Sequence, residues 1–427
     1  MSEQKPAFET RTIHAGAAPD PTTKARITPI YQTASYVFDD VDHAAALFGL
    51  QAFGNIYTRI MNPTNAVLEA RIADLEGGTA ALAVASGHAA QFLVFHTLLA
   101  PGDKFLASRK LYGGSINQFG HSFKSFGWEV IWVDSDDPEN FERAFVPGVK
   151  AIFVESIANP GGVVTDLDAV AAVAKRHHVP LIVDNTLATP YLIRPFEHGA
   201  NIVVHSATKF LGGHGNSIGG LIVDGGNFDW LADDKYPQLS KPNPSYAGLE
   251  IGKTFGNIAL AIAARVLGLR DLGPSLAPMN AFLILTGTET LALRMERHSS
   301  NALAVAKHLA SHPKVAWVSY AGLEGDKYHA LARKYAPKGA GAVFTFGLKG
   351  GYDAGVKLVQ GVKLFSHLAN IGDVRSLIIH PASTTHKQLS PAQRTAAGAG
   401  DDVVRLSVGI ENVVDIIADL DQALAQI

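Results

Sequence analysis

Between about residues 80 and 225 the chain alternates short, continuous apolar runs with segments in which apolar residues recur at helical spacing, such as residues 166–177. Continuous apolar runs are typical of strands buried on both faces, and the helices between them are the crossovers that parallel strands need. The pattern therefore predicts an α/β fold with a mostly parallel central sheet covered by helices on both faces. The predicted strands are residues 81–85, 104–107, 129–133, 151–155, 181–184, 202–205 and 220–223.

Two chemically distinctive residues lie at the ends of predicted strands, where ligands bind in such sheets. Asp184 ends one apolar run, and Lys209 follows another and precedes a glycine-rich stretch. By itself Asp184 would be a helix cap and Lys209 a solvated lysine. Taken together, the lysine amine can form an imine with an aldehyde, and the aspartate can keep a pyridine nitrogen protonated. The pair indicates pyridoxal phosphate (PLP), the cofactor of carbanion chemistry.

Further residues would serve the phosphate and the ring of this cofactor. Ser86, Gly87 and His88 end one strand and open a helix, so their backbone N–H groups would form an anion site, with Gly87 allowing close approach. The hydroxyls of Ser206 and Thr208 suit phosphate oxygens. Tyr112 follows another strand and could stack on a pyridine ring. A purely structural glycine and a plain core tyrosine remain open as alternatives for Gly87 and Tyr112.

Outside this region the sequence predicts three further parts. Residues 1–62 are rich in Thr, Pro and Asp with little periodicity, so we expect an arm that packs on something else. Residues 63–289 form the cofactor-binding domain, in which several prolines and glycines predict a long inserted loop at about 225–260. Residues 290–427 begin with a long helical pattern and form a smaller C-terminal α/β domain.

Composition excludes several classes of function. There are no cysteines in the 427 residues, which excludes disulfides, thiolate metal sites and cysteine nucleophiles, and the histidines show no metal-ligand spacing. The net charge of −3 indicates no nucleic-acid partner. The sequence contains no run of about 18 apolar residues, so we predict no membrane span. The N-terminus is polar and lacks the apolar core of a signal peptide. We expect a cytoplasmic enzyme without a membrane partner or metal.

Motifs along the whole chain from Thr12 onward resemble those of the PLP-dependent Cys/Met metabolism enzymes. This family includes cystathionine γ-synthase, cystathionine β-lyase, methionine γ-lyase and the homoserine-ester sulfhydrylases. The resemblance implies fold type I, the aspartate aminotransferase-like PLP-dependent transferase fold. The motifs are Tyr57-Thr58-Arg59 with Asn62-Pro63-Thr64, Ser86-Gly87, Leu111-Tyr112-Gly113-Gly114, Glu155-Ser156 with Asn159-Pro160, Val183-Asp184-Asn185-Thr186, Ser206-Ala207-Thr208-Lys209 and Arg405-Leu406-Ser407-Val408-Gly409.

The resemblance also implies roles for individual residues. Lys209 would carry the imine and shuttle protons, Asp184 would pair with the ring nitrogen, and Tyr112 would stack on the ring. Thr186 and Asn159 would orient the ring and its 3′-oxygen. The phosphate would be held by Ser86, Gly87, His88, Ser206 and Thr208, together with Tyr57 and Arg59 of a neighbouring subunit. Arg405 would bind the substrate carboxylate, for which arginine is suited, with Ser383 and Arg375 as further substrate-site candidates.

Three features resemble the O-acetylhomoserine sulfhydrylase branch of the family and favour it: the insertion at 225–260, the segments Tyr57–Asn62 and Asn370–Pro381 with Arg375, and Gly114 where typical methionine γ-lyases carry a cysteine. The expected reaction is γ-replacement of acetate by sulfide, giving homocysteine, or methionine if methanethiol is the nucleophile. The expected assembly is a homotetramer of dimers that share active sites. Cystathionine γ-synthase, O-succinylhomoserine sulfhydrylase and methionine γ-lyase are alternatives with the same cofactor residues.

Two alternatives come from other classes. A dinucleotide-binding oxidoreductase could use the same kind of sheet, but the first predicted strand is not followed by a Gly-x-Gly-x-x-Gly turn. A non-catalytic PLP-binding protein would not need Lys209, Asp184, Tyr112 and Arg405 all intact.

Overall fold

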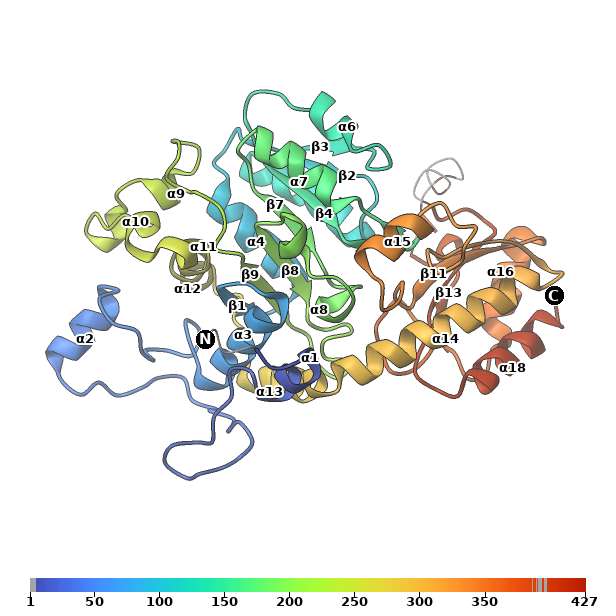
Figure 1. Cartoon of the computed structure of the whole chain (residues 1–427), viewed down its shortest axis with the longest axis horizontal. Helices are drawn as coiled ribbons and strands as arrows, with labels where there is room; N and C mark the ends of the chain where they lie inside the picture. Colours follow the sequence, from blue (N-terminus) through green and yellow to red (C-terminus); the bar gives the residue numbers. More distant parts are fainter. Residues whose placement is uncertain (1–4, 386, 389, 391–393, 395–397) are drawn as a thin grey trace.

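The largest of the three sheets in the described residues matches the predicted strands closely. The computed structural model describes residues 5–385, 387–388, 390, 394 and 398–427. Its largest sheet has seven strands in the order β1-β9-β8-β7-β4-β2-β3 (Figure 1). Each strand lies within one residue or two of a predicted apolar run. The strands are β1 (Ala80–Val84), β2 (Lys104–Ser108), β3 (Glu129–Val133), β4 (Val149–Glu155), β7 (Leu181–Asp184), β8 (Ile202–Ser206) and β9 (Gly220–Asp224).

One strand departs from the parallel arrangement. β9 pairs antiparallel with both β8 and β1, whereas the other pairs in this sheet are parallel. The segment 207–219 between β8 and β9 contains turns and no helix, so it returns the chain directly instead of crossing over the sheet. An apolar run reveals a buried strand but not its direction, which is why the sequence did not distinguish β9 from the rest.

Both faces of the large sheet are buried, as the apolar runs require. Along β7, Leu181 and Val183 enter one hydrophobic cluster and Ile182 enters the other. The first cluster also contains residues of α3 (Pro63–Glu76), α7 (Leu167–Arg176) and α13 (Pro278–Glu289). The second contains residues of α4 (Gly87–Leu98) and α5 (Gly113–Gly120). The helices therefore form layers on both sides of the sheet.

The second sheet belongs to the C-terminal part of the chain. It has five strands in the order β10-β11-β14-β13-β12, of which only β12 and β13 pair parallel. The long helix α14 (Leu291–Ser311) leads into it from the large sheet (Figure 1), and α16 (Gly351–Gly361) and α18 (Val413–Leu424) pack together beside it. Its strands are β10 (Val315–Ser319), β11 (Val343–Leu348), β12 (Ser366–His367), β13 (Leu377–Ile379) and β14 (Val403–Ser407).

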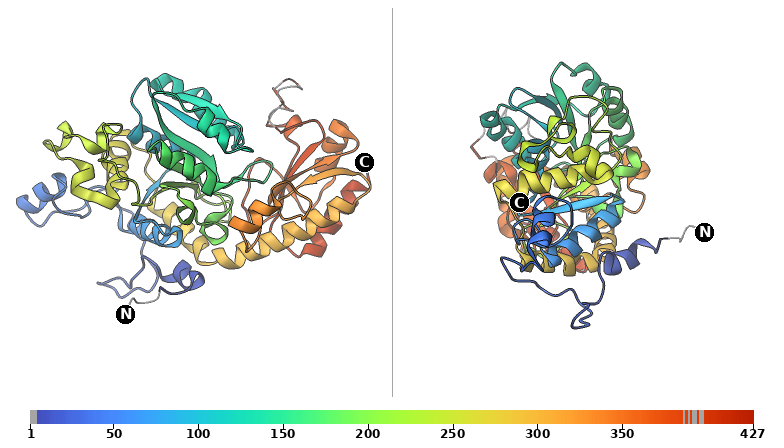
Figure 2. Two further views of the ribbon diagram at one scale, coloured as in Figure 1. Left: turned by 45° about the horizontal axis from the view of Figure 1, so that its top comes forward. Right: turned by 90° about the vertical axis from the view of Figure 1, so that its left-hand side faces the viewer.

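The N-terminal segment lies largely outside these two bodies. Apart from α1 (Phe8–His14) and α2 (Val41–Phe48) it is irregular, and α2 extends away from the large sheet (Figures 1 and 2). Many of its large apolar side chains are exposed in the single chain, among them Val37, Val41 and Phe53, whereas Leu47 is buried. Apolar side chains that are exposed together in one segment differ from the single, scattered ones that are usual on a protein surface.

The predicted loop at 225–260 is instead a folded insertion. It contains the short helices α9 (Pro237–Ser240) and α10 (Ile251–Phe255), and Trp230, Tyr236 and Leu239 are buried in the second hydrophobic cluster. Prolines and glycines break these helices into single turns, which removes the periodicity that would have predicted them. Within the described residues, no helix is both long enough and apolar enough to cross a membrane.

Candidate active site

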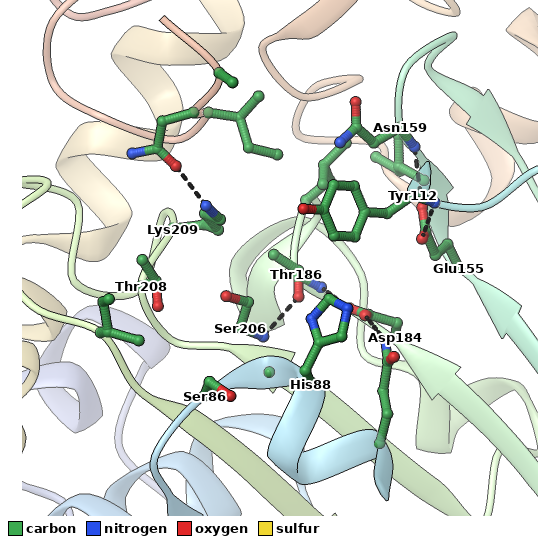
Figure 3. Close-up of a pocket in the computed structure, with 18 of the residues that line it drawn as sticks. Ser86, His88, Tyr112, Glu155, Asn159, Asp184, Thr186, Ser206, Thr208 and Lys209 are labelled. Atoms are coloured by element: carbon green, nitrogen blue, oxygen red, sulfur yellow. Dashed lines mark hydrogen bonds between the residues drawn. The ribbon is translucent and has the colours of Figure 1, made fainter. Parts of the chain in front are cut away.

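A cavity of about 240 Å³ lies at the carboxyl ends of the strands of the large sheet. It collects most of the residues that the sequence singled out (Figure 3), and Asn370 and Arg405 from the small-sheet side also line it. The lining residues include Ser86, Gly87, His88, Gln91, Tyr112, Glu155, Asn159, Asp184, Thr186, Ser206, Thr208, Lys209, Ala369, Asn370, Ile371 and Arg405.

Asp184 ends β7 at the floor of this cavity, and both of its carboxylate oxygens are oriented by hydrogen bonds. The backbone N–H of Thr186 donates to Oδ1 (3.0 Å), and the side-chain amide of Gln91 donates to Oδ2 (3.2 Å). Gln91 is fixed in turn by a hydrogen bond from its Nε2 to the Ser115 hydroxyl (3.0 Å). The sequence analysis missed Gln91, because nothing in its local pattern on α4 indicates that it faces Asp184.

The N-terminus of α4 and the end of β8 form a cradle for an anion. Ser86 caps α4, with its hydroxyl accepting the Ala89 N–H (3.1 Å), so the free N–H groups of the first turn point towards the cavity. A Cβ on Gly87 would lie 2.8 Å from Cβ of Ser206, so only glycine lets the helix approach β8 this closely. Thr186 Oγ1 accepts the Ser206 N–H (2.8 Å), which holds the Ser206 side of the cradle.

Lys209 extends into the cavity from the segment after β8. Burial, with a smaller contribution from the positive charge of Arg405, lowers the pKa of the Lys209 amine. A lowered pKa increases the fraction of neutral amine, which is the nucleophilic form. The Nζ atom donates a hydrogen bond to Oδ1 of Asn370, a residue of the small-sheet side that the sequence analysis did not single out.

Arg405 enters the cavity from β14 on the opposite side. Its Nη1 donates to Oδ1 of Asn159 (3.2 Å) and its Nη2 to the main-chain oxygen of Asn370 (3.1 Å). Burial lowers the pKa of its guanidinium to about 10, so it stays charged at neutral pH. These neighbours are neutral oxygens and leave the positive charge uncompensated, which suits the binding of a carboxylate.

Tyr112 flanks the cavity as the residue preceding α5. Its ring is half exposed and meets the His88 imidazole edge to face, with centroids 5.8 Å apart. Its backbone N–H donates to Oε1 of Glu155 (2.6 Å). The ring therefore stands beside the cavity, above the end of the sheet (Figure 3).

Four predicted residues do not line the cavity of this chain. The Arg59 guanidinium lies over the Tyr57 ring and donates to the main-chain oxygen of Arg270 (2.7 Å). Arg375 pairs with Asp373 (3.0 Å), and its side chain is 63% exposed. The Ser383 hydroxyl instead makes a hydrogen bond with Nδ1 of His380 (2.9 Å). The insertion at 225–260 also contributes no lining residue.

Arg375, which the sequence predicts as a substrate-site candidate, therefore does not reach the cavity of its own chain. Arg375 lies five residues after Asn370 on the same segment, and Asn370 is the residue that reaches Lys209. The loop turns at Gly372, whose φ of +74° is unfavourable for other residues, and this turn directs Arg375 outward.

These features fit the cofactor that the sequence indicates. PLP requires an amine for its aldehyde, an acid for its ring nitrogen and an anion site for its phosphate. The cavity holds Lys209, Asp184 and the α4 cradle in one space, and the cradle exists only because Gly87 has no side chain.

Comparisons with known proteins identify the family of the chain. The family model for Cys/Met metabolism PLP-dependent enzymes matches residues 9–425. An O-acetyl-L-homoserine sulfhydrylase of Leptospira meyeri is 53% identical, with 98% of this chain and 97% of that protein covered. A homocysteine synthase of Schizosaccharomyces pombe is 50% identical over 99% of both chains.

Solved structures give the same result. The chain resembles a crystal structure of a Campylobacter jejuni protein assigned as an O-acetylhomoserine (thiol)-lyase, with a TM-score of 0.94 and 42% identity. The similarity covers 98% of this chain and 99% of that one, which contains N′-pyridoxyl-lysine-5′-monophosphate.

Proposed function

Because the chain belongs to the Cys/Met metabolism PLP-dependent enzyme family, we propose that it converts O-acetyl-L-homoserine and sulfide into L-homocysteine and acetate. In this γ-replacement the bond between Cγ and the acetate oxygen breaks and a bond between Cγ and sulfur forms. The observation that carries the proposal is one cavity that holds Lys209, Asp184 and Arg405. The choice of ester and nucleophile is supported by relatives named for this reaction.

When bound, PLP supplies an aldehyde for covalent attachment and a ring that withdraws electrons from the substrate. Lys209 provides the amine for that attachment, and its lowered pKa suits an amine that must both take up and release protons at Cα, Cβ and Cγ. Asp184, whose carboxylate is oriented by Thr186 and Gln91, would pair with the ring nitrogen. Thr186 and Asn159 orient the ring.

Other residues act on the substrate and the phosphate. Arg405 binds the α-carboxylate, since its charge is buried without an acidic partner among its hydrogen bonds. Tyr112 stacks on the ring and assists the departure of acetate from Cγ. The phosphate is bound by the α4 cradle and by the hydroxyls on the β8 side, namely Ser86, Gly87, His88, Ser206 and Thr208.

We further propose that the active unit is a dimer in which Tyr57 and Arg59 complete the partner's phosphate site, and that two dimers form a homotetramer. The exposed apolar side chains of the N-terminal arm support such an assembly, because a single chain gains nothing from exposing them. The cytoplasm is the proposed location, and methanethiol is proposed as a second nucleophile that would give methionine.

The test is a side-by-side assay of the purified, PLP-loaded protein. O-Acetylhomoserine, O-succinylhomoserine, O-acetylserine and methionine are each supplied with sulfide, methanethiol or cysteine, and the products are identified. We expect O-acetylhomoserine with sulfide to give homocysteine far faster than the ester alone gives 2-oxobutyrate and ammonia, because a closed site excludes water.

Each alternative has its own outcome in this assay. Faster cleavage of methionine than sulfhydrylation of the ester would make the protein a methionine γ-lyase. Cysteine outcompeting sulfide would indicate cystathionine γ-synthase, and preference for the succinyl ester would indicate O-succinylhomoserine sulfhydrylase. A protein that binds PLP but turns over none of these substrates would be a non-catalytic PLP-binding protein.

A further inference from the structure

Glu155 is a buried acid in the active-site cavity that the reaction described above does not use. It is the last residue of β4, and its register partner on the neighbouring strand β7 is Asp184. The residue is only 4% exposed and lines the cavity. A second carboxyl group beside the one that serves the ring nitrogen requires an explanation.

This position is unfavourable for a carboxylate. Burial, and then the negative charge of Asp184, raise the pKa of Glu155 well above its ordinary value. An apolar side chain or a neutral amide would avoid the cost of burying a charge beside a like charge. Glu155 therefore has to make contacts that such side chains cannot make.

The contacts are two backbone hydrogen bonds, one to each carboxylate oxygen. The Tyr112 N–H donates to Oε1 (2.6 Å) and the Asn159 N–H donates to Oε2 (3.0 Å). Glu155 thereby connects the segment after β2 to the segment after β4, which are separate loops at the edge of the sheet. An amide side chain cannot replace it, because it offers one acceptor oxygen where two N–H donors must be bound.

Tyr112 and Asn159, the two residues held in this way, both line the cavity but present different groups to it. Tyr112 presents its ring, and Asn159 presents its side-chain amide, whose oxygen also accepts a hydrogen bond from Arg405. Glu155 itself is held from the other side, since the Thr165 hydroxyl donates to its main-chain oxygen (2.7 Å). One carboxylate thus sets the relative positions of the stacking ring and of the amide that contacts the carboxylate-binding arginine.

We propose that Glu155 is a positioning residue that fixes Tyr112 and Asn159 relative to each other in the cavity that would hold the cofactor. The inference rests on the proposed PLP site, but it does not depend on which ester or nucleophile the enzyme uses.

The test compares Glu155→Gln with Asp224→Asn. Asp224 is a matched control, because it is also a buried carboxyl and burial raises its pKa to about 6. Its carboxylate also accepts hydrogen bonds from two backbone N–H groups, those of Gly226 (2.9 Å) and Ala261 (3.1 Å). It ends the antiparallel strand β9 and therefore lies at the edge of the sheet opposite to the cavity. Both variants lose one acceptor for a backbone N–H.

Three properties are measured on the purified proteins: thermal stability, PLP affinity by titration of cofactor-free protein, and the visible circular dichroism of bound PLP. The steady-state kcat is then measured on the loaded enzymes. We expect Glu155→Gln to weaken PLP binding about tenfold and to lower kcat about tenfold, because one charge-assisted hydrogen bond is lost. We also expect the dichroism band of bound PLP to change. Asp224→Asn should keep PLP affinity and kcat within about twofold, whatever its stability.

A double-mutant cycle separates positioning from a general structural role. In a Tyr112→Ala background there is no ring left to position, so Glu155→Gln should lose most of its effect on PLP affinity. Equal effects of Glu155→Gln with and without the ring, or a dichroism band identical to that of the wild-type protein, would overturn the proposal. If Glu155→Gln does not fold, Glu155→Asp, which keeps both oxygens but shortens the reach, undergoes the same measurements.

The PLP titration and the dichroism band need no turnover. Their results therefore stand if the enzyme prefers a different ester, whereas a protein without PLP affinity would refute the proposed function itself.

Discussion

Substitution of Gly114 by alanine should impair cofactor binding and turnover while leaving the fold intact. Gly114 lies in the first turn of α5, two residues after Tyr112. A Cβ at this position would lie 2.4 Å from Cε1 and 2.8 Å from Cζ of the Tyr112 ring, and 2.9 Å from Cε1 of His88. Gly114 thus provides the space in which the Tyr112 ring stands.

The size of the effect follows from these distances. Carbon atoms in contact prefer a separation of about 3.5–4.0 Å, so the ring has to move by roughly 1 Å or swing away. Keeping the ring in place would cost about 1–3 kcal/mol, as overpacking does, which reduces the stacking-competent population about 5- to 150-fold. Because the Tyr112 residue is 47% exposed, the ring can swing out into solvent, and the cost appears as lost function and not as lost stability.

Gly113→Ala is the matched control, since a Cβ at Gly113 would have no atom within 4 Å. Both variants are purified, and their thermal stability, PLP affinity and kcat for O-acetylhomoserine with sulfide are compared. We expect similar melting temperatures for the two proteins, with PLP affinity and kcat reduced only in Gly114→Ala. A Gly114→Ala enzyme with activity within about twofold of the control would refute the reasoning. So would a crystal structure of that variant with Tyr112 unmoved.

Three further predictions concern the proposed roles of the cavity residues. Lys209→Ala should abolish turnover without a change in thermal unfolding, since the cavity offers no second amine, and a borohydride-reducible adduct on another lysine would contradict this. Asp184→Asn should slow solvent-deuterium exchange at the substrate Cα by orders of magnitude, because removing one partner of a buried ion pair costs about 3–5 kcal/mol. The exchange rate is measured by NMR, and an unchanged rate would rule out the pairing of Asp184 with the ring nitrogen. Arg59→Ala should weaken PLP retention by about 1.5–3 kcal/mol, and mixing it with Lys209→Ala should restore part of the activity through hybrid dimers that carry one intact site. A fully active monomer in sedimentation would be incompatible with that sharing.

The positions of the main elements could be read from the sequence because they depend on local patterns. Each apolar run between residues 80 and 225 became a strand of the large sheet, since a strand buried on both faces must be apolar along its whole length. Lys209 and Asp184 were recognised for the same reason: each directly follows or ends such a run, and the ends of parallel strands meet at one edge.

Local patterns failed where the chain is broken by prolines and glycines. The insertion at 225–260 buries Trp230, Tyr236 and Leu239 in the second hydrophobic cluster, although its single-turn helices leave no periodic signal. The direction of β9 was equally invisible, because an apolar strand has the same composition whether it runs parallel or antiparallel.

Contacts between residues far apart in the chain were decided by the tertiary structure alone. Gln91 meets Asp184 and Asn370 meets Lys209 only because the order of strands and the packing of the two sheets bring them together. Arg375, which the sequence placed at the substrate, turns out to solvent beyond Gly372. Sequence periodicity determines which face of an element is buried, but a side chain's partner across the cavity depends on how separate elements pack, and no local pattern encodes that packing.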